Sequence, residues 1–149
     1  MRAVVQRVAR ASVRVLDEVV GRIERGLLLY AAAAPDDADN DVRYIADKVS
    51  HLRVFPDADG KLNLDVTQSG GAVLLVSAFT VLADARRGRR PSLDSSAPGD
   101  VAAPLVVRLA DAIRSHGVEV ETGRFAAYMQ VESVNDGPIC ILLDSRRSF

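Results

Sequence analysis

The chain contains a single cysteine and only two histidines, and this scarcity excludes several kinds of site. Cys140 has no second cysteine with which to form a disulfide inside the chain, as is usual in a reducing compartment. His51 and His116, even together with Cys140, cannot supply the four ligands of a structural zinc site. We therefore expect no disulfide, no metal, no bound cofactor and a cytoplasmic location.

Long apolar runs and an excess of one charge are also missing. No stretch is apolar for long enough to cross a bilayer, and the first residues do not form the apolar core of a signal peptide. Lysine and arginine number 19 against 20 aspartate and glutamate, which leaves a net charge of −1. An even total still allows a local basic patch. With 149 residues, 48% of them hydrophobic, we expect one globular domain over 1–149.

The common catalytic motifs are absent as well. There is no GxSxG nucleophile elbow, no phosphate-binding glycine loop and no HExxH pair. Cys140 lies among apolar residues, as a small buried hydrophobic residue would, and each histidine falls near the end of a predicted helix. Any catalytic site must therefore be of a less common kind.

Hydrophobic periodicity predicts short strands and two helices. Period-two alternation indicates strands at 1–8 and 11–15, paired as a hairpin, and the apolar run 26–33 indicates a central buried strand. Helical spacing predicts helices over 38–51, with Asp36 and Asp37 as N-cap residues, and over 98–117. Further strands are expected at 54–55, 62–64, 72–76, 118–122, 125–131 and 139–143. This order indicates an α+β domain whose antiparallel or mixed sheets close into a barrel-like core.

Two short stretches interrupt apolar strands with polar or conformationally special residues. Ser77-Ala78-Phe79-Thr80 follows the apolar strand, where unpaired backbone N–H groups can form an oxyanion hole; ordinary strand termination is the alternative. Asn135-Asp136-Gly137-Pro138 has the composition of a turn. Its Gly-Pro bond could also be cis, and the sequence does not decide which isomer is present.

A third stretch concentrates positive charge. Arg86, Arg87, Arg89 and Arg90 fall within the segment 84–99, which is rich in Arg, Gly, Pro and Ser and is predicted to be a long loop. Guanidinium groups bind phosphate well, so the loop is a candidate for docking an RNA backbone. The alternative is a solvated surface loop.

Taken together, these residues resemble the D-aminoacyl-tRNA deacylase family, also called the D-tyrosyl-tRNA deacylase family. The resemblance runs over the whole chain. It is carried by the opening MRAVVQRV, by GKLNL at 60–64, by GRRPS at 88–92, by TGRF at 122–125 and by NDGP at 135–138.

The resemblance implies a homodimer with an active site at the subunit interface, which binds the 3′ end of a charged tRNA. Ser77–Thr80 would hold the aminoacyl carbonyl through backbone N–H groups, and the terminal ribose hydroxyl of the tRNA would help to activate water. Gly137-Pro138 would be cis and would enter the partner's pocket, where it rejects L side chains and admits D-amino acids or glycine. Arg7 would orient that motif, and Met129 would shape the pocket with Phe79.

The chain departs from the family pattern at a few positions. Ala78 stands where the family usually has glutamine in Ser-Gln-Phe-Thr, so any contribution of that amide is lost. Cys140 replaces the usual threonine after Gly-Pro-Ile, and Leu93 replaces a common phenylalanine. If backbone donors perform the catalysis, activity survives the change at Ala78.

Three other functions remain open. A related deacylase branch that removes L-alanine from the wrong tRNA carries Pro-Gln-Ala-Thr at the site, whereas this chain keeps Ser77 and Phe79. A non-catalytic tRNA-binding module would explain Ala78 and the arginines. A plain dimeric scaffold would leave the arginines unexplained.

Overall fold

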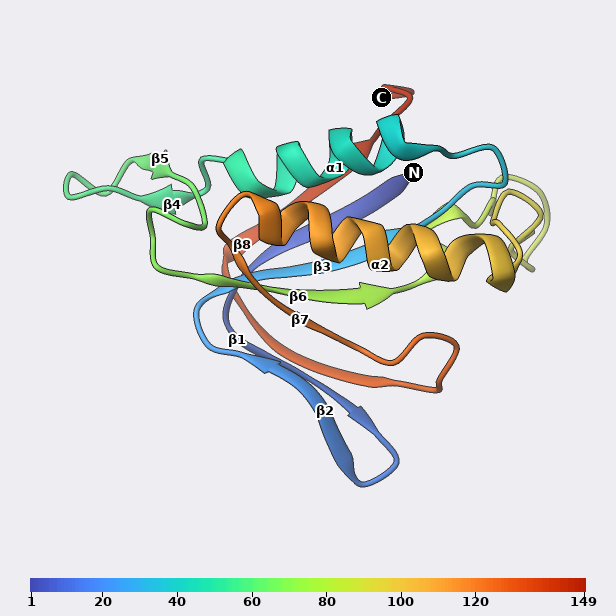
Figure 1. Cartoon of the computed structure of the whole chain (residues 1–149), viewed down its shortest axis with the longest axis horizontal. Helices are drawn as coiled ribbons and strands as arrows, with labels where there is room; N and C mark the ends of the chain where they lie inside the picture. Colours follow the sequence, from blue (N-terminus) through green and yellow to red (C-terminus); the bar gives the residue numbers. More distant parts are fainter.

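A mixed β-sheet carries both α-helices on one of its faces in the computed structural model, which describes residues 1–149 (Figure 1). The strands are β1 (Arg2–Val15), β2 (Glu18–Ile23), β3 (Gly26–Ala32), β4 (Phe55–Pro56), β5 (Leu62–Leu64), β6 (Ala72–Ser77), β7 (Glu119–Thr122) and β8 (Gln130–Asp144). The helices are α1 (Asp39–His51), the short 3₁₀ helix η1 (Phe79–Leu82) and α2 (Gly99–Ser115). Neither α-helix is both long and apolar enough to cross a membrane.

The sheet curls until its two ends touch. Its strand order is β2-β1-β3-β6-β7, with β8 paired to the other edge of β1. β3, β6 and β7 run parallel, whereas β1 is antiparallel to all three of its partners. At Gly21 of β2, a Cβ atom would lie 2.6 Å from the carbonyl oxygen of Thr122 in β7, so the two ends are in direct contact. The predicted α+β class with a nearly closed, barrel-like core is confirmed.

The predicted hairpin between 1–8 and 11–15 is wrong, because both segments belong to the single strand β1. Its first half pairs with β3, its second half with β2, and β8 follows both halves. The alternation of buried residues changes phase at Val8, where the pairing with β8 is also irregular. A bulge of this kind bends a strand without reversing it.

Alternate residues of the central strand feed two separate cores. Leu27 and Leu29 of β3 are fully buried against α1 and α2, where they join Leu105 and Leu109 of α2. Leu28, between them, faces the inside of the curl and belongs to a second cluster. Burial on both faces explains the uninterrupted apolar run of this strand.

The first helix begins one residue later than its predicted caps. Ala38 is the N-cap residue of α1, and its backbone N–H donates to the carboxylate of Asp41 at 2.9 Å. Asp37 instead accepts from the N–H of Ala34 at 2.6 Å, which closes the turn before the helix. The second helix follows Pro98, as expected, and the chain leaves it at Gly117 in the left-handed region (φ 82°).

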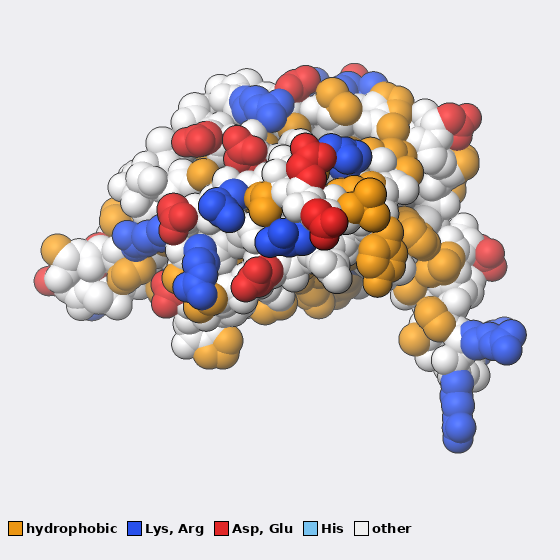
Figure 2. Space-filling model, turned by 90° about the horizontal axis from the view of Figure 1, so that it is seen from below, with side chains coloured by type: hydrophobic (Ala, Val, Ile, Leu, Met, Phe, Trp, Pro, Cys, Tyr) orange, Lys and Arg blue, Asp and Glu red, His pale blue; other side chains and the backbone are white.

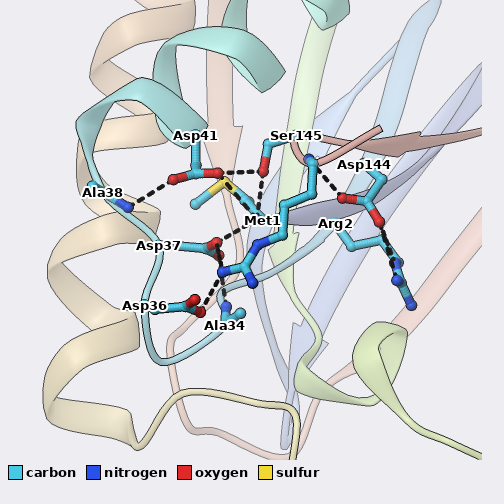
Figure 3. A network of polar contacts seen from close by, with 10 residues as sticks. Met1, Arg2, Ala34, Asp36, Asp37, Ala38, Asp41, Asp144 and Ser145 are labelled. Atoms are coloured by element: carbon cyan, nitrogen blue, oxygen red, sulfur yellow. Dashed lines mark hydrogen bonds and ion pairs between the residues drawn. The ribbon is translucent and has the colours of Figure 1, made fainter. Parts of the chain in front are cut away.

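Polar contacts close the barrel end at which both chain termini lie (Figures 1 and 3). The α-amino group of Met1 is buried and donates to Asp37 Oδ1 at 2.6 Å and to Ser145 Oγ at 2.7 Å. Ser145 donates in turn to Asp41 at 2.5 Å, and Arg146 pairs with Asp37 at 3.3 Å. These contacts tie the end of β8 to the start of α1.

Candidate active site

A pocket of about 430 Å³ opens where β3 and β6 end beneath the first turns of α2. Its wall comprises Ala31–Ala33, Ser77–Phe79, Ala97, Gly99, Ala102, Val106, Phe125–Ala127 and Met129. No ionisable side chain belongs to this wall. The pocket therefore provides shape and backbone dipoles, and no acid or base of its own.

Small side chains create the hollow. Three consecutive alanines, Ala31–Ala33, end the central strand, and Ala102 faces them from α2. Met129 closes the wall by lying against Gly123, where a Cβ atom would be 2.7 Å from the methionine sulfur. Alanine and glycine at these places leave space that larger residues would fill.

Backbone donors gather on one side of the pocket, at the start of η1. The carbonyl of Ala78, the N-cap residue, accepts from the N–H of Val81 at 3.0 Å. The N–H groups of Phe79 and Thr80 precede this first helical bond and have no partner within the helix. The N–H of Ala78 is different, since it donates to the carbonyl of Ala31 at 2.9 Å. Of the predicted stretch, Phe79 and Thr80 thus offer the donors.

The structure brings Ser77, Ala78, Phe79 and Met129 together around the pocket, as the sequence predicted for the site. Thr80 lies beside it, exposed on η1, and does not form part of the wall. Because the wall contains Ala78, the position where the family has glutamine borders the cavity.

The predicted turn at 135–138 is instead an excursion within one strand. β8 pairs with β1 on both sides of it, and the register passes from Gln6 opposite Cys140 to Val8 opposite Asn135. The side chain of Asn135 closes the excursion by accepting from the N–H of Ile139 at 2.9 Å and donating to its carbonyl at 3.0 Å. Gly137-Pro138 is cis and exposed.

Arg7 lies opposite this excursion and contacts its base. Arg7 is 8% exposed, and its guanidinium donates to the carbonyl of Asp136 at 2.8 Å and to that of Val54 at 2.5 Å. A long side chain in the middle of β1 thus joins the excursion to the segment that follows α1. Gly137 and Pro138 are not part of the wall of this chain's own pocket.

The four arginines occupy the tip of a loop, as predicted. Asp84 and Ser92 pin its base through two backbone hydrogen bonds of 2.8 and 2.9 Å. Arg86 is bound by Asp84, and its side-chain hydrogen bonds hold the pKa of that carboxyl well below its usual range. Arg87, Arg89 and Arg90 make no salt bridge. Figure 2 shows basic side chains projecting from the end of the molecule that carries this loop.

The site also contains residues to which sequence reasoning gave no role. Phe125 and Ala126 lie in the pocket wall, and Ala126 has a φ of 59°, which is uncommon for a residue with a side chain. The alanine run that ends the central strand was a usable signal, because small residues at the end of a buried strand leave room for a ligand. No local sequence pattern indicated that residues of α2 would line the pocket.

Comparison with known proteins gives consistent results. The sequence model of the family described as D-Tyr-tRNA(Tyr) deacylase matches residues 4–144. The chain is 55% identical to the D-aminoacyl-tRNA deacylase of Anaeromyxobacter dehalogenans (strain 2CP-C) and 51% identical to that of Thermotoga petrophila (strain ATCC BAA-488 / DSM 13995 / JCM 10881 / RKU-1). Both matches cover the whole of each chain.

Solved structures share the fold. A structure described as the c-Myc DNA Unwinding Element Binding Protein superposes with a TM-score of 0.90 at 34% identity, over 97% of this chain and 98% of that one. A structure described as a "probable eukaryotic D-amino acid tRNA deacylase" gives 0.83 at 17% identity, over 95% and 97%. The chain belongs to the D-Tyr-tRNA(Tyr) deacylase family.

Proposed function

We propose that this protein hydrolyses the ester bond of D-aminoacyl-tRNA and releases the free D-amino acid and the tRNA. The observation that carries the proposal is the pocket bordered by Ser77–Phe79, beside which η1 begins with the N–H groups of Phe79 and Thr80. Relatives that match over their full length are named D-aminoacyl-tRNA deacylases. The pocket is large enough for an amino acid and part of the terminal nucleoside.

The chemistry needs an oxyanion site more than a protein base. Water attacks the ester carbonyl, the carbonyl oxygen becomes negative, and the ester C–O bond to the ribose then breaks as a proton passes to the ribose oxygen. The N–H groups of Phe79 and Thr80 stabilise the oxyanion by hydrogen bonding. Because the wall has no ionisable side chain, the neighbouring ribose hydroxyl of the substrate helps to activate the water.

The second part of the proposal is a homodimer in which Gly137-Pro138 enters the partner's pocket. Two observations support it. The excursion is exposed and is not part of its own chain's pocket, so a role in substrate recognition requires a second copy. β8 has an unpaired outer edge, and its Leu142 is 57% exposed, which are features of an interface.

In this arrangement the amino acid is selected by exclusion. An L side chain would point at Gly137-Pro138 and clash, whereas a D side chain points away from it. Glycine has no side chain to clash, so glycyl-tRNA is hydrolysed as well. The arginines 86–90 bind the RNA backbone beside the pocket.

The test is hydrolysis of D-Tyr-tRNA and L-Tyr-tRNA by the purified protein, with a chelator present. We expect rapid loss of the D ester and survival of the L ester. Equal hydrolysis of both esters would contradict the exclusion mechanism, and hydrolysis of neither would contradict the proposed activity.

A mixed-dimer experiment tests the cross-subunit arrangement. Ala102→Trp blocks the pocket but leaves the excursion intact, whereas Pro138→Ala leaves the pocket intact and removes the proline ring. We expect the first variant to be inactive and the second to hydrolyse L-Tyr-tRNA. In a mixed dimer of the two variants, the open pocket belongs to the Pro138→Ala subunit and faces the intact Pro138 of the Ala102→Trp subunit. Hydrolysis of L-Tyr-tRNA per open pocket should therefore fall below that of the Pro138→Ala homodimer. Unchanged L hydrolysis would show that the motif acts within its own chain.

A second candidate is a nucleic-acid-binding module without catalysis. It is favoured by the structural relative named as a DNA unwinding element binding protein and by the alanine at position 78. Tight tRNA binding without turnover of either ester would identify it. An L-alanyl-tRNA deacylase is disfavoured, because Ser77 and Phe79 differ from that branch; preferential hydrolysis of L-Ala-tRNA would reverse this ranking.

A further inference from the structure

Aromatic side chains are few in this chain, yet several of them gather around the pocket. The sequence has four phenylalanines and three tyrosines. Phe79, 58% exposed, and Phe125, 38% exposed, both belong to the pocket wall. Tyr128 is 88% exposed and stands between Ala127 and Met129, which are wall residues too. It is the one residue of 125–129 that does not line the pocket.

Tyr128 has no contact within the chain that explains its position. Tyr44, by contrast, lies under Lys48 and Arg147 in cation–π contacts, and Tyr30 is half-buried beside the second core cluster. The ring of Tyr128 makes no aromatic or cation–π contact, and its hydroxyl makes no hydrogen bond. An exposed aromatic ring beside a ligand pocket offers both of its faces to a planar partner.

A second segment that leads into the pocket wall indicates which partner fits. The arginine loop, residues 84–92, continues into Ser96, whose hydroxyl donates to the carbonyl of Phe79 at 2.8 Å, and then into the wall residue Ala97. An exposed aromatic ring and a loop of cationic side chains are thus carried by two segments that both lead into the pocket wall. A single-stranded nucleic acid matches this combination, because its phosphates bind cations and its bases stack on aromatic rings.

We propose that Tyr128 is a stacking platform for the nucleobase that precedes the terminal adenosine of the tRNA 3′ end. The inference rests on the proposed function, in which the terminal aminoacyl-adenosine occupies the pocket. The preceding nucleotide must then lie outside the pocket, at its rim. Tyr128 therefore contributes to the affinity for the RNA and does not touch the ester.

The test compares two substrates that differ outside the pocket. D-Tyr-tRNA has the preceding nucleotide, whereas 3′-O-(D-tyrosyl)adenosine lacks it. We expect Tyr128→Ala to lower kcat/KM about tenfold for the tRNA, mainly through KM, and to leave the adenosine ester unchanged. Tyr128→Phe keeps the ring and should retain the wild-type value. Leu62→Ala, exposed on the β4–β5 hairpin at the other end of the molecule, is the control (Figure 1).

Two outcomes overturn the proposal: an equal loss on both substrates, which would place Tyr128 in the pocket, and no loss on either.

A binding measurement separates this inference from the proposed function. Affinity for uncharged tRNA with a complete 3′ end should fall about tenfold in Tyr128→Ala, but not affinity for tRNA that lacks its last three nucleotides. If that holds while wild type hydrolyses neither ester, the proposed activity fails and the stacking site stands.

Discussion

Arg7 of β1 and Asp136 of β8 are joined twice. The Nε atom of Arg7 donates to the main-chain carbonyl of Asp136 at 2.8 Å and lies 3.3 Å from its carboxylate Oδ2. The same guanidinium also holds the carbonyl of Val54. One nearly buried side chain therefore fixes the base of the Gly137-Pro138 excursion to the body of the barrel.

Arg7→Met should loosen this excursion. Methionine fills similar space but leaves the carbonyls of Val54 and Asp136 without donors, so we expect a loss of about 2 kcal/mol in the free energy of unfolding. The ratio of D-Tyr-tRNA to L-Tyr-tRNA hydrolysis should fall as the motif loses its position. Urea denaturation and the two hydrolysis rates measure these effects. Arg10→Met, exposed on the same strand, is the control; an unchanged ratio in Arg7→Met would rule out a positioning role.

The arginine loop should determine the salt dependence of tRNA binding. Arg86 is neutralised by Asp84, whereas Arg87, Arg89 and Arg90 have no acidic partner. Replacing one of these three by alanine should reduce the slope of log K against log salt concentration by about 0.7–0.9. Arg86→Ala should change the slope less, because its charge is already paired. Equal slopes for all variants would mean that the loop does not contact phosphate.

Periodicity predicted most elements of the fold because burial imposes it. The apolar run at 26–33 became the central strand, and both helices lie within two or three residues of their expected bounds. Local patterns could not distinguish a bulge from a turn. The break between the alternating segments 1–8 and 11–15 and the Asn-Asp-Gly-Pro composition at 135–138 each suggested a reversal, whereas strand pairing continues past both.

The candidate site was only partly accessible to sequence reasoning. Ser77–Phe79, which the strand end and the family resemblance both indicate, and Met129, which the resemblance alone indicates, line the pocket. The wall contributed by α2 depends on how that helix packs across the ends of β3 and β6, which no local pattern encodes. The occupied N–H of Ala78 likewise depends on pairing with Ala31, a residue 47 positions earlier.

Ala78→Gln restores the side chain usual in the family and tests what it contributes. In the proposed mechanism the donors are the N–H groups of Phe79 and Thr80, and the substitution leaves the backbone bond from Ala78 to Ala31 in place. We therefore expect the rate of single-turnover hydrolysis of D-Tyr-tRNA to change by less than about tenfold. Removal of one oxyanion-hole donor would change this rate by more. A gain of a hundredfold would show that the amide takes part in the reaction. Ala127→Ser, another polar change in the wall, is the control.

Gly26→Ala should destabilise the fold strongly. A Cβ atom on Gly26 would lie 1.9 Å from the carbonyl oxygen of Ala72, at the point where β3 and β6 begin to pair. The strands would have to separate there, at a cost of about 3 kcal/mol. At Gly99, the same substitution meets only a ring atom of Phe125 at 3.8 Å and should be nearly neutral. The urea denaturation midpoints of the two variants test this explanation. A large drop at Gly26 alone would confirm that the close approach of the two strands matters, whereas equal drops would mean that replacing any glycine is harmful.

The contacts around the chain termini should make the fold sensitive to acid. Burial opposes ionisation of Asp144, but hydrogen bonds from the Arg146 N–H and from Arg2 outweigh it and lower the pKa of that carboxyl. Burial likewise opposes ionisation of Asp41, and hydrogen bonds from the Ser145 hydroxyl and the Ala38 N–H lower its pKa. Both groups therefore bind protons less readily in the folded state than in the unfolded state.

The sign of the pH dependence follows from linkage. Where the unfolded chain binds more protons than the folded one, stability rises with pH. The contribution of the two carboxylates is thus complete above the unfolded pKa of about 3.9 and is lost as the pH falls through the folded values. We expect similar urea midpoints at pH 5 and pH 7 and a lower one at pH 3. Asp144→Asn should lower the midpoint more at pH 6 than at pH 3, whereas Asp59→Asn, in an exposed turn, should have little effect at either pH. An equal drop in the urea midpoint at both pH values would mean that the charge of Asp144 does not stabilise the contacts around the chain termini.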